Sequence, residues 1–232
     1  MEGNKRFRNR AHAGIELARS LRCYSNAANT TVVGLTRGGV PAATALSEEL
    51  NLPCNVFVSR KISTPEDRRC ALGAVTETGV VFLDEAALRN EPWLPRELRR
   101  YLEEELRLRE GDVALRRACY RGGGTPPDFH DQTVIVVDDG ACTGATFIAA
   151  VQSLQKLGAR HLIGALPVAS ERAVEQIRLL TDDLVVLLAP DKMENLGDYY
   201  DNLAELSDKE IVTCLAARRK AASENASRET AA

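Results

Sequence analysis

Short apolar runs alternate along this chain with stretches in which apolar residues recur at helical spacing. The central run, residues 134–137, holds four β-branched residues without a polar interruption, as expected of a strand covered on both faces. Strands and helices in this order predict an α/β fold with a doubly wound, mostly parallel sheet. We interpret residues 31–35, 56–59, 80–83, 134–137, 161–167 and 184–189 as strands, and residues 7–22, 41–50, 94–120, 147–157 and 170–180 as helices.

The remaining segments divide the chain into a core and a C-terminal appendage. Residues 62–75 include a polar, charged stretch without periodicity, which predicts a flexible loop. Residues 94–120 are highly charged, with leucines at helical spacing, and predict a helical insert that Gly111 interrupts. We expect the core at 1–189, the appendage at 190–206, a closing helix at 207–220 and a disordered tail at 221–232.

Composition and charge argue against several classes of partner. The chain has 232 residues, of which 44% are apolar, so a full core is available. The formal net charge of −3 argues against bulk electrostatic binding to nucleic acid or acidic membranes. Six scattered cysteines without a Cys-x-x-Cys pair predict free thiols. The sequence shows no signal-peptide pattern and no run of 18 apolar residues, so we expect a soluble, cytoplasmic protein.

Two carboxylates, Asp138 and Asp139, follow the central run directly, and a loop of small residues follows them. Backbone N–H groups at the start of the next helix lack partners within that helix. The loop of small residues, called the phosphate loop here, can therefore surround a phosphate. A phosphate would repel the carboxylates, so we expect them to face vicinal hydroxyl groups or a cation. Together these features predict a seat for a ribose 5-phosphate. The phosphate loop consists of Gly140, Ala141, Cys142, Thr143, Gly144, Ala145 and Thr146.

A second group of candidate residues follows two other strands. Glycines after Arg37 free backbone N–H groups to face an anion, and the arginine itself offers a fork of donors. Two adjacent cations follow the run at 56–59, and ligands of open α/β sheets bind beyond the carboxyl ends of strands. This second anion site consists of Thr36, Arg37, Gly38, Gly39, Arg60 and Lys61.

Each motif also has a purely structural interpretation. The stretch after residue 137 could be a helix cap with two solvated aspartates, and Arg-Gly-Gly alone is more often a turn. Arg60 and Lys61 could extend into water. Arg8, Arg10 and Arg121 could reach a phosphate, but solvated helix charges are the more common role of the first two. The phosphate loop is neither a Walker loop nor a Gly-x-Gly-x-x-Gly dinucleotide loop, because it lacks the lysine and the glycine spacing that these require.

The stretch 134–146 resembles the loop that binds 5-phosphoribosyl-1-diphosphate (PRPP) in type I phosphoribosyltransferases. That loop combines an apolar run, two acids, three variable residues and Thr-Gly-x-Thr. The resemblance covers roughly residues 7–215 and is nearest to a poorly characterised bacterial branch of the family. Five motifs of that branch occur here in the same order, namely Phe7-Arg8-Asn9-Arg10, Arg37-Gly38-Gly39, Arg60-Lys61, Gly73-Ala74-Val75 and the acid pair with the phosphate loop.

The resemblance implies an enzyme that transfers 5-phosphoribosyl from PRPP to a nitrogenous base and releases diphosphate. It implies that the phosphate loop binds the ribose phosphate and that the second anion site binds the diphosphate. It also implies Mg²⁺ as the cofactor, held by Asp138 and Asp139 directly or through water. Catalytic roles are implied for these two acids together with Arg37 and Lys61.

The appendage at 190–206 resembles the hood that covers the acceptor in these transferases. Its candidate acceptor contacts are Leu196, Gly197, Tyr199 and Tyr200. Either tyrosine could stack on a planar base, and packing of the hood onto the core is the alternative. The implied partners are PRPP and a nitrogenous base or another small acceptor, and the resemblance leaves a homodimer open.

Two residues depart from the family pattern. Thr36 stands where that branch usually has proline. Cys142 stands where 6-oxopurine transferases carry an aspartate, which argues against hypoxanthine or guanine as the acceptor. A cysteine nucleophile is a further idea, but no neighbouring base is evident in the sequence. Two other functions stay open, namely a non-catalytic PRPP-binding regulator and a PRPP or nucleotide hydrolase.

Overall fold

Five parallel strands form the centre of this computed structural model, which describes residues 6–64, 71–90, 93, 95–121 and 127–217. The strand order is β2-β1-β6-β7-β8, and every neighbouring pair in it is parallel. The predicted doubly wound, mostly parallel sheet is therefore confirmed. The strands are β1 (Thr30–Leu35), β2 (Cys54–Phe57), β6 (Thr133–Val137), β7 (His161–Val168) and β8 (Asp183–Leu188).

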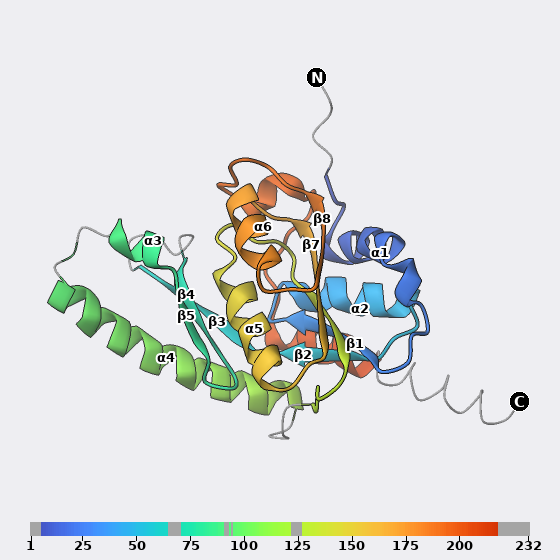
Figure 1. Cartoon of the computed structure of the whole chain (residues 1–232), viewed down its shortest axis with the longest axis horizontal. Helices are drawn as coiled ribbons and strands as arrows, with labels where there is room; N and C mark the ends of the chain where they lie inside the picture. Colours follow the sequence, from blue (N-terminus) through green and yellow to red (C-terminus); the bar gives the residue numbers. More distant parts are fainter. Residues whose placement is uncertain (1–5, 65–70, 91–92, 94, 122–126, 218–232) are drawn as a thin grey trace, which may run out of the picture.

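Helices cover both faces of this sheet (Figure 1). Successive side chains of a strand point to opposite faces, so Val33 of β1 packs in the core under α5 and α6, whereas Val32 packs in the core under α1 and α2. Burial on both faces explains why the run in β6 is apolar throughout. The helices are α1 (Arg10–Ser20), α2 (Gly39–Glu49), α5 (Ala145–Lys156) and α6 (Glu171–Arg178).

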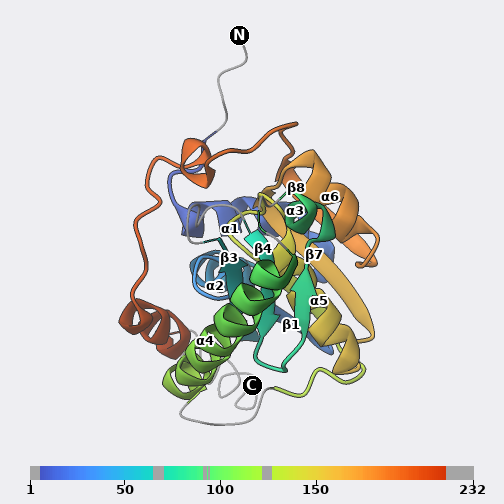
Figure 2. The same cartoon turned by 90° about the vertical axis from the view of Figure 1, so that its left-hand side faces the viewer.

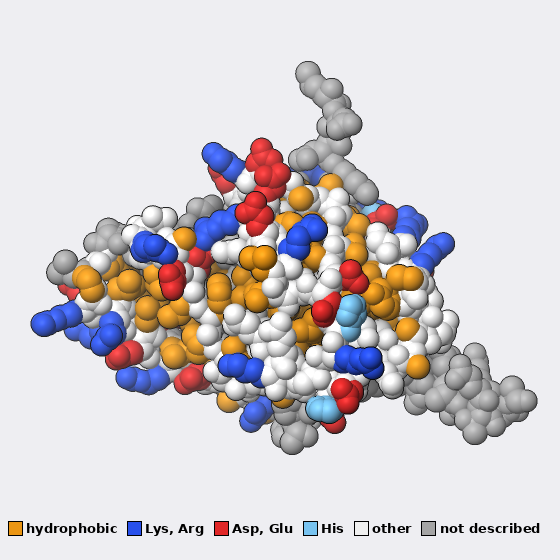
Figure 3. Space-filling view, viewed as in Figure 1, with side chains coloured by type: hydrophobic (Ala, Val, Ile, Leu, Met, Phe, Trp, Pro, Cys, Tyr) orange, Lys and Arg blue, Asp and Glu red, His pale blue; other side chains and the backbone are white. Residues whose placement is uncertain are grey.

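A second, antiparallel sheet projects beside the core and, with two helices, forms an arm (Figures 1 and 2). Helix α4 packs along this sheet and buries Val113 and Tyr120 in the core beneath it. Its outer face is charged, but Leu108 and Leu115 are 64% and 73% exposed, and Figure 3 shows apolar side chains between charged ones over the arm. The arm contains β3 (Ser59–Ser63), β4 (Ala71–Thr76), β5 (Val81–Leu83), α3 (Glu85–Arg89) and α4 (Pro95–Arg121).

Three expectations for the arm need correction. The run at 56–59 is not one strand, because β2 ends at Phe57 and β3 begins at Ser59 in the other sheet. The loop predicted at 62–75 is shorter, because all six residues of β4 are buried against the core, and its residues 65–70 lie outside the described residues. Gly111 does not interrupt α4, since one glycine costs only about 1 kcal/mol in a long helix.

The N-terminal segment and the hood lie side by side. Phe7 forms a parallel bridge with Tyr200, and its N–H donates to the carbonyl of Tyr199 over 2.9 Å. Helix α1 begins only at Arg10, later than predicted, because the Asn9 side chain caps it. The chain also forms η1 (Arg22–Tyr24), η2 (Leu196–Tyr199) and a helix at 208–217 that packs against α4.

The predictions for residues 218–220 of the closing helix and for the tail at 221–232 lie outside the described residues. Among the helices that are described, none combines the length and the apolar character needed to cross a membrane.

Candidate active site

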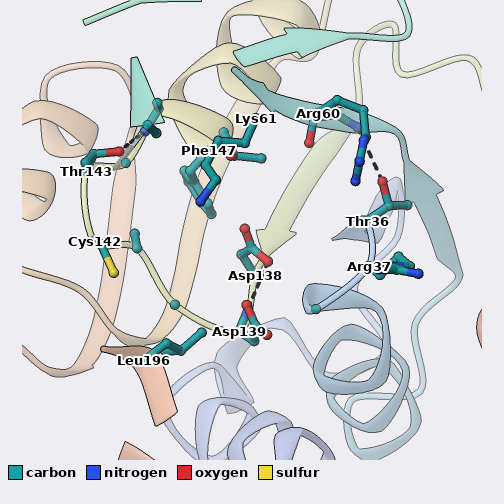
Figure 4. Close-up of a pocket in the computed structure, with 18 of the residues that line it drawn as sticks. Thr36, Arg37, Arg60, Lys61, Asp138, Asp139, Cys142, Thr143, Phe147 and Leu196 are labelled. Atoms are coloured by element: carbon teal, nitrogen blue, oxygen red, sulfur yellow. Dashed lines mark hydrogen bonds between the residues drawn. The ribbon is translucent and has the colours of Figure 1, made fainter. Parts of the chain in front are cut away.

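A cleft of about 450 Å³ opens at the carboxyl ends of β1 and β6, between the core, the arm and the hood (Figure 4). It brings together the acid pair, the whole phosphate loop and most of the second anion site, which come from both sheets. The lining consists of residues 36–38, 59–61, 138–147 and 194–196, with Arg10, Ala71, Glu205 and Leu206.

The two carboxylates of the acid pair have different hydrogen-bond partners. The Asp139 carboxylate accepts a hydrogen bond from Arg10 Nε over 2.7 Å, and its backbone carbonyl accepts one from the Tyr200 hydroxyl over 2.6 Å. The Asp138 carboxylate accepts the Asp139 N–H over 2.9 Å and faces the cleft. Burial raises the pKa of Asp138 well above its ordinary value, and the neighbouring Asp139 charge raises it further. Ionisation of Asp138 therefore destabilises the folded protein unless a hydroxyl group or a cation binds to the carboxylate.

The phosphate loop lines the cleft, and hydrogen bonds to Val168 and Ser170 hold it in place. Ala141 N–H donates to the carbonyl of Val168 over 3.0 Å, and the Ser170 hydroxyl donates to the carbonyl of Cys142 over 2.6 Å. Gly144 adopts a left-handed conformation with φ of 77°, and α5 starts at the next residue without a side-chain cap. An anion in the cleft would therefore meet the open N-terminus of a 12-residue helix.

The two glycines of the second anion site allow the loop after β1 to touch the acid loop. A Cβ on Gly38 would lie 2.1 Å from Asp139 Oδ2, and a Cβ on Gly39 would lie 2.4 Å from the carbonyl oxygen of Val137. The Thr36–Arg37 peptide bond just before them is cis. Anion access alone does not explain these glycines, because contact between the two loops also requires them.

Two cations of the arm form one wall of the cleft. Arg60 and Lys61 lie within β3 and line the cavity, although they belong to a different sheet from the acid pair. Arg60 Nη2 lies 3.3 Å from Asp112 Oδ2, while its Nε and the Ser59 hydroxyl are buried without a hydrogen-bond partner in the described part of the chain. Burial lowers the pKa of Arg60, and the nearby Arg116 charge adds to this. An anionic ligand that reached either of these donors would supply the missing partner.

The hood brings some of its predicted residues to the cleft. Leu196 lines the cavity and packs so closely on Gly140 that a Cβ there would lie 2.5 Å from its Cδ1. Tyr200 is only 3% exposed and packs on Phe7, so this ring holds the hood on the core instead of facing an acceptor. Gly197 and Tyr199 are half-buried and are not among the cleft-lining residues of the described chain.

Several residues took positions that sequence reasoning missed. Arg10 lines the cleft and pairs with Asp139, and the Phe-Arg-x-Arg motif was its one sequence signal. Arg121 does not face the cleft, because it forms a buried ion pair with Glu77. Four further hood residues line the cleft and carried no recognisable signal, namely Glu194, Asn195, Glu205 and Leu206.

The acid pair fits the way that Mg²⁺ binds in proteins. Within the described residues, no group of three or more His, Cys, Asp or Glu side chains gathers into a complete metal cage. Mg²⁺ commonly takes only one or two carboxylates and fills its remaining positions with water and substrate oxygens. Asp138 and Asp139 offer such a partial set at the edge of an open cavity.

We expect Cys142 to be a poor nucleophile despite its place in the phosphate loop. Burial raises the pKa of its thiol, and the opposing charge of Lys61 has a smaller effect. Less thiolate is then present at pH 8, so iodoacetamide should alkylate Cys142 more slowly than the exposed Cys23. Mass-spectrometric peptide mapping after timed alkylation of the folded protein measures both rates. Equal rates at the two cysteines would contradict this expectation.

Comparisons with known proteins agree with this geometry. The model of the family described as the phosphoribosyl transferase domain matches residues 5–187 of this chain. The Mycobacterium tuberculosis protein Rv0571c, provisionally named a phosphoribosyl transferase, is 32% identical over 213 residues, which are 91% of this chain and 46% of that protein. The chain thus spans about half the length of these curated relatives.

A solved structure extends the likeness to the fold. The crystal structure of the protein TT1426 from Thermus thermophilus superposes with a TM-score of 0.69 at 33% sequence identity. The match covers 90% of this chain and 97% of that one. A shorter match links 86 residues of this chain, at 28% identity, to a uracil phosphoribosyltransferase of Staphylococcus saprophyticus.

Proposed function

This chain belongs to the phosphoribosyl transferase family, and we propose that it uses PRPP and Mg²⁺ to transfer a 5-phosphoribosyl group to a nitrogenous base with release of diphosphate. The observation that carries this proposal is the composition of one cleft. An acid pair, a helix N-terminus without a side-chain cap from Gly144, and cationic side chains of β3 and of the loop after β1 all line it. A phosphorylated sugar with a diphosphate leaving group needs each of these three partners.

The phosphate loop supports the first of these assignments. Its backbone N–H groups and the N-terminus of α5 would hold the 5-phosphate, which carries no reacting bond. This contact fixes the sugar, so that its anomeric carbon stands between the acid pair and the second anion site. The overall charge of −3 gives no general attraction for such a ligand, so these local donors must provide it.

Arg37, Arg60 and Lys61 support the departure of diphosphate. Negative charge grows on the leaving oxygen as its bond to the anomeric carbon breaks, and preorganised cations stabilise that charge. Arg60 is suited to this role because its buried Nε has no hydrogen-bond partner among the described residues. The amide groups of Gly38 and Gly39 would add neutral donors at the same place.

Asp138 and Asp139 support the sugar from its hydroxyl side. Each carboxylate can accept hydrogen bonds from the ribose diol, and the two negative charges stabilise an anomeric carbon that becomes cation-like. Mg²⁺ bound to this pair and to substrate oxygens would add charge neutralisation at the diphosphate. A nitrogen of the acceptor then forms the new bond at the anomeric carbon with inversion. We assign no general base.

Diphosphate release from PRPP and Mg²⁺ tests the proposal. The assay runs with no acceptor and with a panel of purines, pyrimidines and pyridine bases. We expect release that depends on one class of base. Tight PRPP binding without turnover would instead indicate a regulator, and release without any base would indicate a hydrolase. Failure to bind PRPP would overturn the proposal as a whole.

We expect Asp138→Asn to weaken PRPP binding while its ligand-free form becomes more stable. The raised pKa means that ionised Asp138 destabilises the folded protein above its ordinary pKa of 3.8, and asparagine removes that charge. The gain in melting temperature should be present at pH 8 and vanish as the pH falls toward 4. The loss of a charged contact should weaken PRPP binding about 10- to 100-fold.

Asp139→Asn provides the matched comparison for this variant. It should also weaken PRPP binding, but it should lower the stability of the ligand-free protein, because Arg10 loses the charge that it pairs with. Melting curves in EDTA and PRPP titrations in Mg²⁺ measure the two effects separately. A lower melting temperature for Asp138→Asn at pH 8 would contradict the account of this site.

A further inference from the structure

Arg10, at the first turn of α1, contacts two parts of the cleft at once. Its Nε donates to Asp139 Oδ2 and its Nη1 donates to the carbonyl of Ala204, each over 2.7 Å. The side chain is only 14% exposed and lines the cavity. The partners are 129 and 194 residues away along the chain. One guanidinium therefore joins the acid loop to the segment that contains the last residues of the hood and leads to the helix at 208–217.

That segment, residues 201–207, is called the strap here. It runs from the hood to the helix at 208–217 beside α4 (Figure 2). Its first residues are fixed to the N-terminal segment, since Asp201 N–H donates to the carbonyl of Phe7 over 2.9 Å. Its far end is fixed to the arm, since Asp208 accepts hydrogen bonds from Arg116, over 2.7 Å, and from the hydroxyl of Tyr120.

The middle of the strap forms part of the cleft. Glu205 and Leu206 line the cavity next to the residue that Arg10 holds. In the described chain, the contact from Arg10 to Ala204 is the side-chain hydrogen bond that ties this middle portion to the core. Leu203 and Leu206 also pack against apolar clusters of the protein, so Arg10 adds a polar contact between them that fixes the backbone of the strap beside the cleft.

Arg10 also fixes the carboxylate of Asp139. Asp139 is 8% exposed, and its carboxylate lies between Arg10 Nε on one side and the Gly38 backbone on the other. Arg10 donates to Oδ2, and among the described residues no hydrogen bond to Oδ1 is found. Because the guanidinium is planar and rigid, fixing one of its contacts also orients the other.

We propose that Arg10 is a positioning residue that couples the sugar-binding acid Asp139 to the strap, so that binding of the ribosyl donor sets the acceptor side of the cleft. This inference rests on the proposed function, because it takes the donor to be PRPP. When the donor binds, the side chain of Asp139 becomes more firmly oriented. Arg10 transmits this ordering to Ala204. Glu205 and Leu206 are then positioned beside the acceptor. By reciprocity, an ordered strap strengthens donor binding to the same degree.

Two substitutions and a control test this coupling. Arg10→Ala removes both contacts, and Arg10→Lys keeps a positive charge near Asp139 but cannot make both contacts with one rigid group. Arg19→Ala is the matched control, because Arg19 lies on the same helix, is 61% exposed and pairs only with Glu16 among the described residues. Titration with PRPP in Mg²⁺ gives the dissociation constant, and hydrogen exchange of residues 201–207 reports on the strap with and without PRPP.

We expect Arg10→Ala to raise the dissociation constant for PRPP about 10- to 100-fold, as loss of a group that orients a ligating side chain commonly does. Exchange in the strap should become faster, and PRPP should no longer slow it. Arg10→Lys should recover only part of the PRPP affinity, through its positive charge near Asp139, and should not recover the protection of the strap. Arg19→Ala should match the wild type in both measurements.

Two results would overturn the inference alone. One is a PRPP affinity in Arg10→Ala equal to that of the wild type, which a residue that only stabilises the fold would give. The other is strap exchange that PRPP slows equally in both proteins. A wild-type protein that does not bind PRPP would overturn the proposed function and this inference together, and the wild-type titration alone identifies that case.

Discussion

Gly38→Ala should lower the rate of diphosphate release about 10²- to 10³-fold, because it pushes apart two loops that must hold the donor together. A Cβ at this position would lie 2.1 Å from Oδ2 and 2.3 Å from Cγ of Asp139. The backbone itself accepts alanine, since Gly38 has φ of −59° and ψ of −40°. The entire effect is therefore steric and falls on the acid that we assign to the ribose.

Gly111→Ala is the matched control for this substitution. It also adds one methyl group, but nothing in the described structure lies within 4 Å of that position on the exposed side of α4. It should leave the reaction rate unchanged and stabilise the helix by about 0.5–1 kcal/mol. Comparing the two variants separates a general effect of glycine replacement from an effect of this contact.

A double variant tests the steric cause without any assay of activity. Shortening the acid in Asp139→Ala removes the carboxylate that a Cβ on Gly38 would meet. The loss of unfolding free energy caused by Gly38→Ala should then be smaller in the Asp139→Ala background than in the wild type. Equal losses in the two backgrounds, measured by urea denaturation, would show that the two loops do not touch in this way.

The features predicted correctly from the sequence are those set by residues close together in the chain. The apolar run before Asp138 indicated a strand buried on both faces, and chain order then placed both loops at the same edge of a parallel sheet. The loop of small residues before α5 also follows from the local sequence, and phosphate binding by that loop stays a prediction. None of these inferences needed to know which distant segment packs against which.

The features that were missed depend on contacts between distant segments. The sequence around Arg60 and Lys61 does not indicate a strand, because β3 is partly polar. This strand is stabilised by its pairing with β4, which the local sequence does not show. Arg10 looked like a solvated helix charge until the fold brought Asp139 beside it. Tyr200 looked like a ring for stacking on a base, yet its hydroxyl meets the carbonyl of Asp139.

Arg121→Ala should destabilise the whole protein by about 3–5 kcal/mol, which is the cost of breaking a buried ion pair by removing one partner. Arg121 donates from Nη1 and Nη2 to the two carboxylate oxygens of Glu77 over 2.7 and 2.8 Å, and it also donates to the carbonyl of Val56. The two side chains are 6% and 0% exposed. The ion pair fixes the last turn of α4 to the segment that follows β4 within the arm, and the bond to Val56 of β2 joins that turn to the core.

The loss should depend on pH in a defined direction. Burial raises the pKa of Glu77 above its ordinary value of 4.5, and the arginine opposes that rise. Without Arg121 the pKa rises further, so the folded variant takes up a proton more readily than its unfolded chain does. The difference in unfolding free energy from the wild type should be largest at pH 8 and should shrink as the pH falls toward 4.5.

An apolar replacement of both partners separates the missing charge from the missing packing. Arg121→Met combined with Glu77→Leu leaves no buried charge, so it should recover all but about 1 kcal/mol, the cost of the carbonyl of Val56 without its donor. Chemical denaturation at pH 8 and pH 5 measures the wild type and both variants. If the double variant were as unstable as Arg121→Ala, or if the loss in Arg121→Ala did not change with pH, the unpaired Glu77 charge could not be its cause. The attachment of the last turn of α4 would then depend on the shape of the arginine and not on its charge.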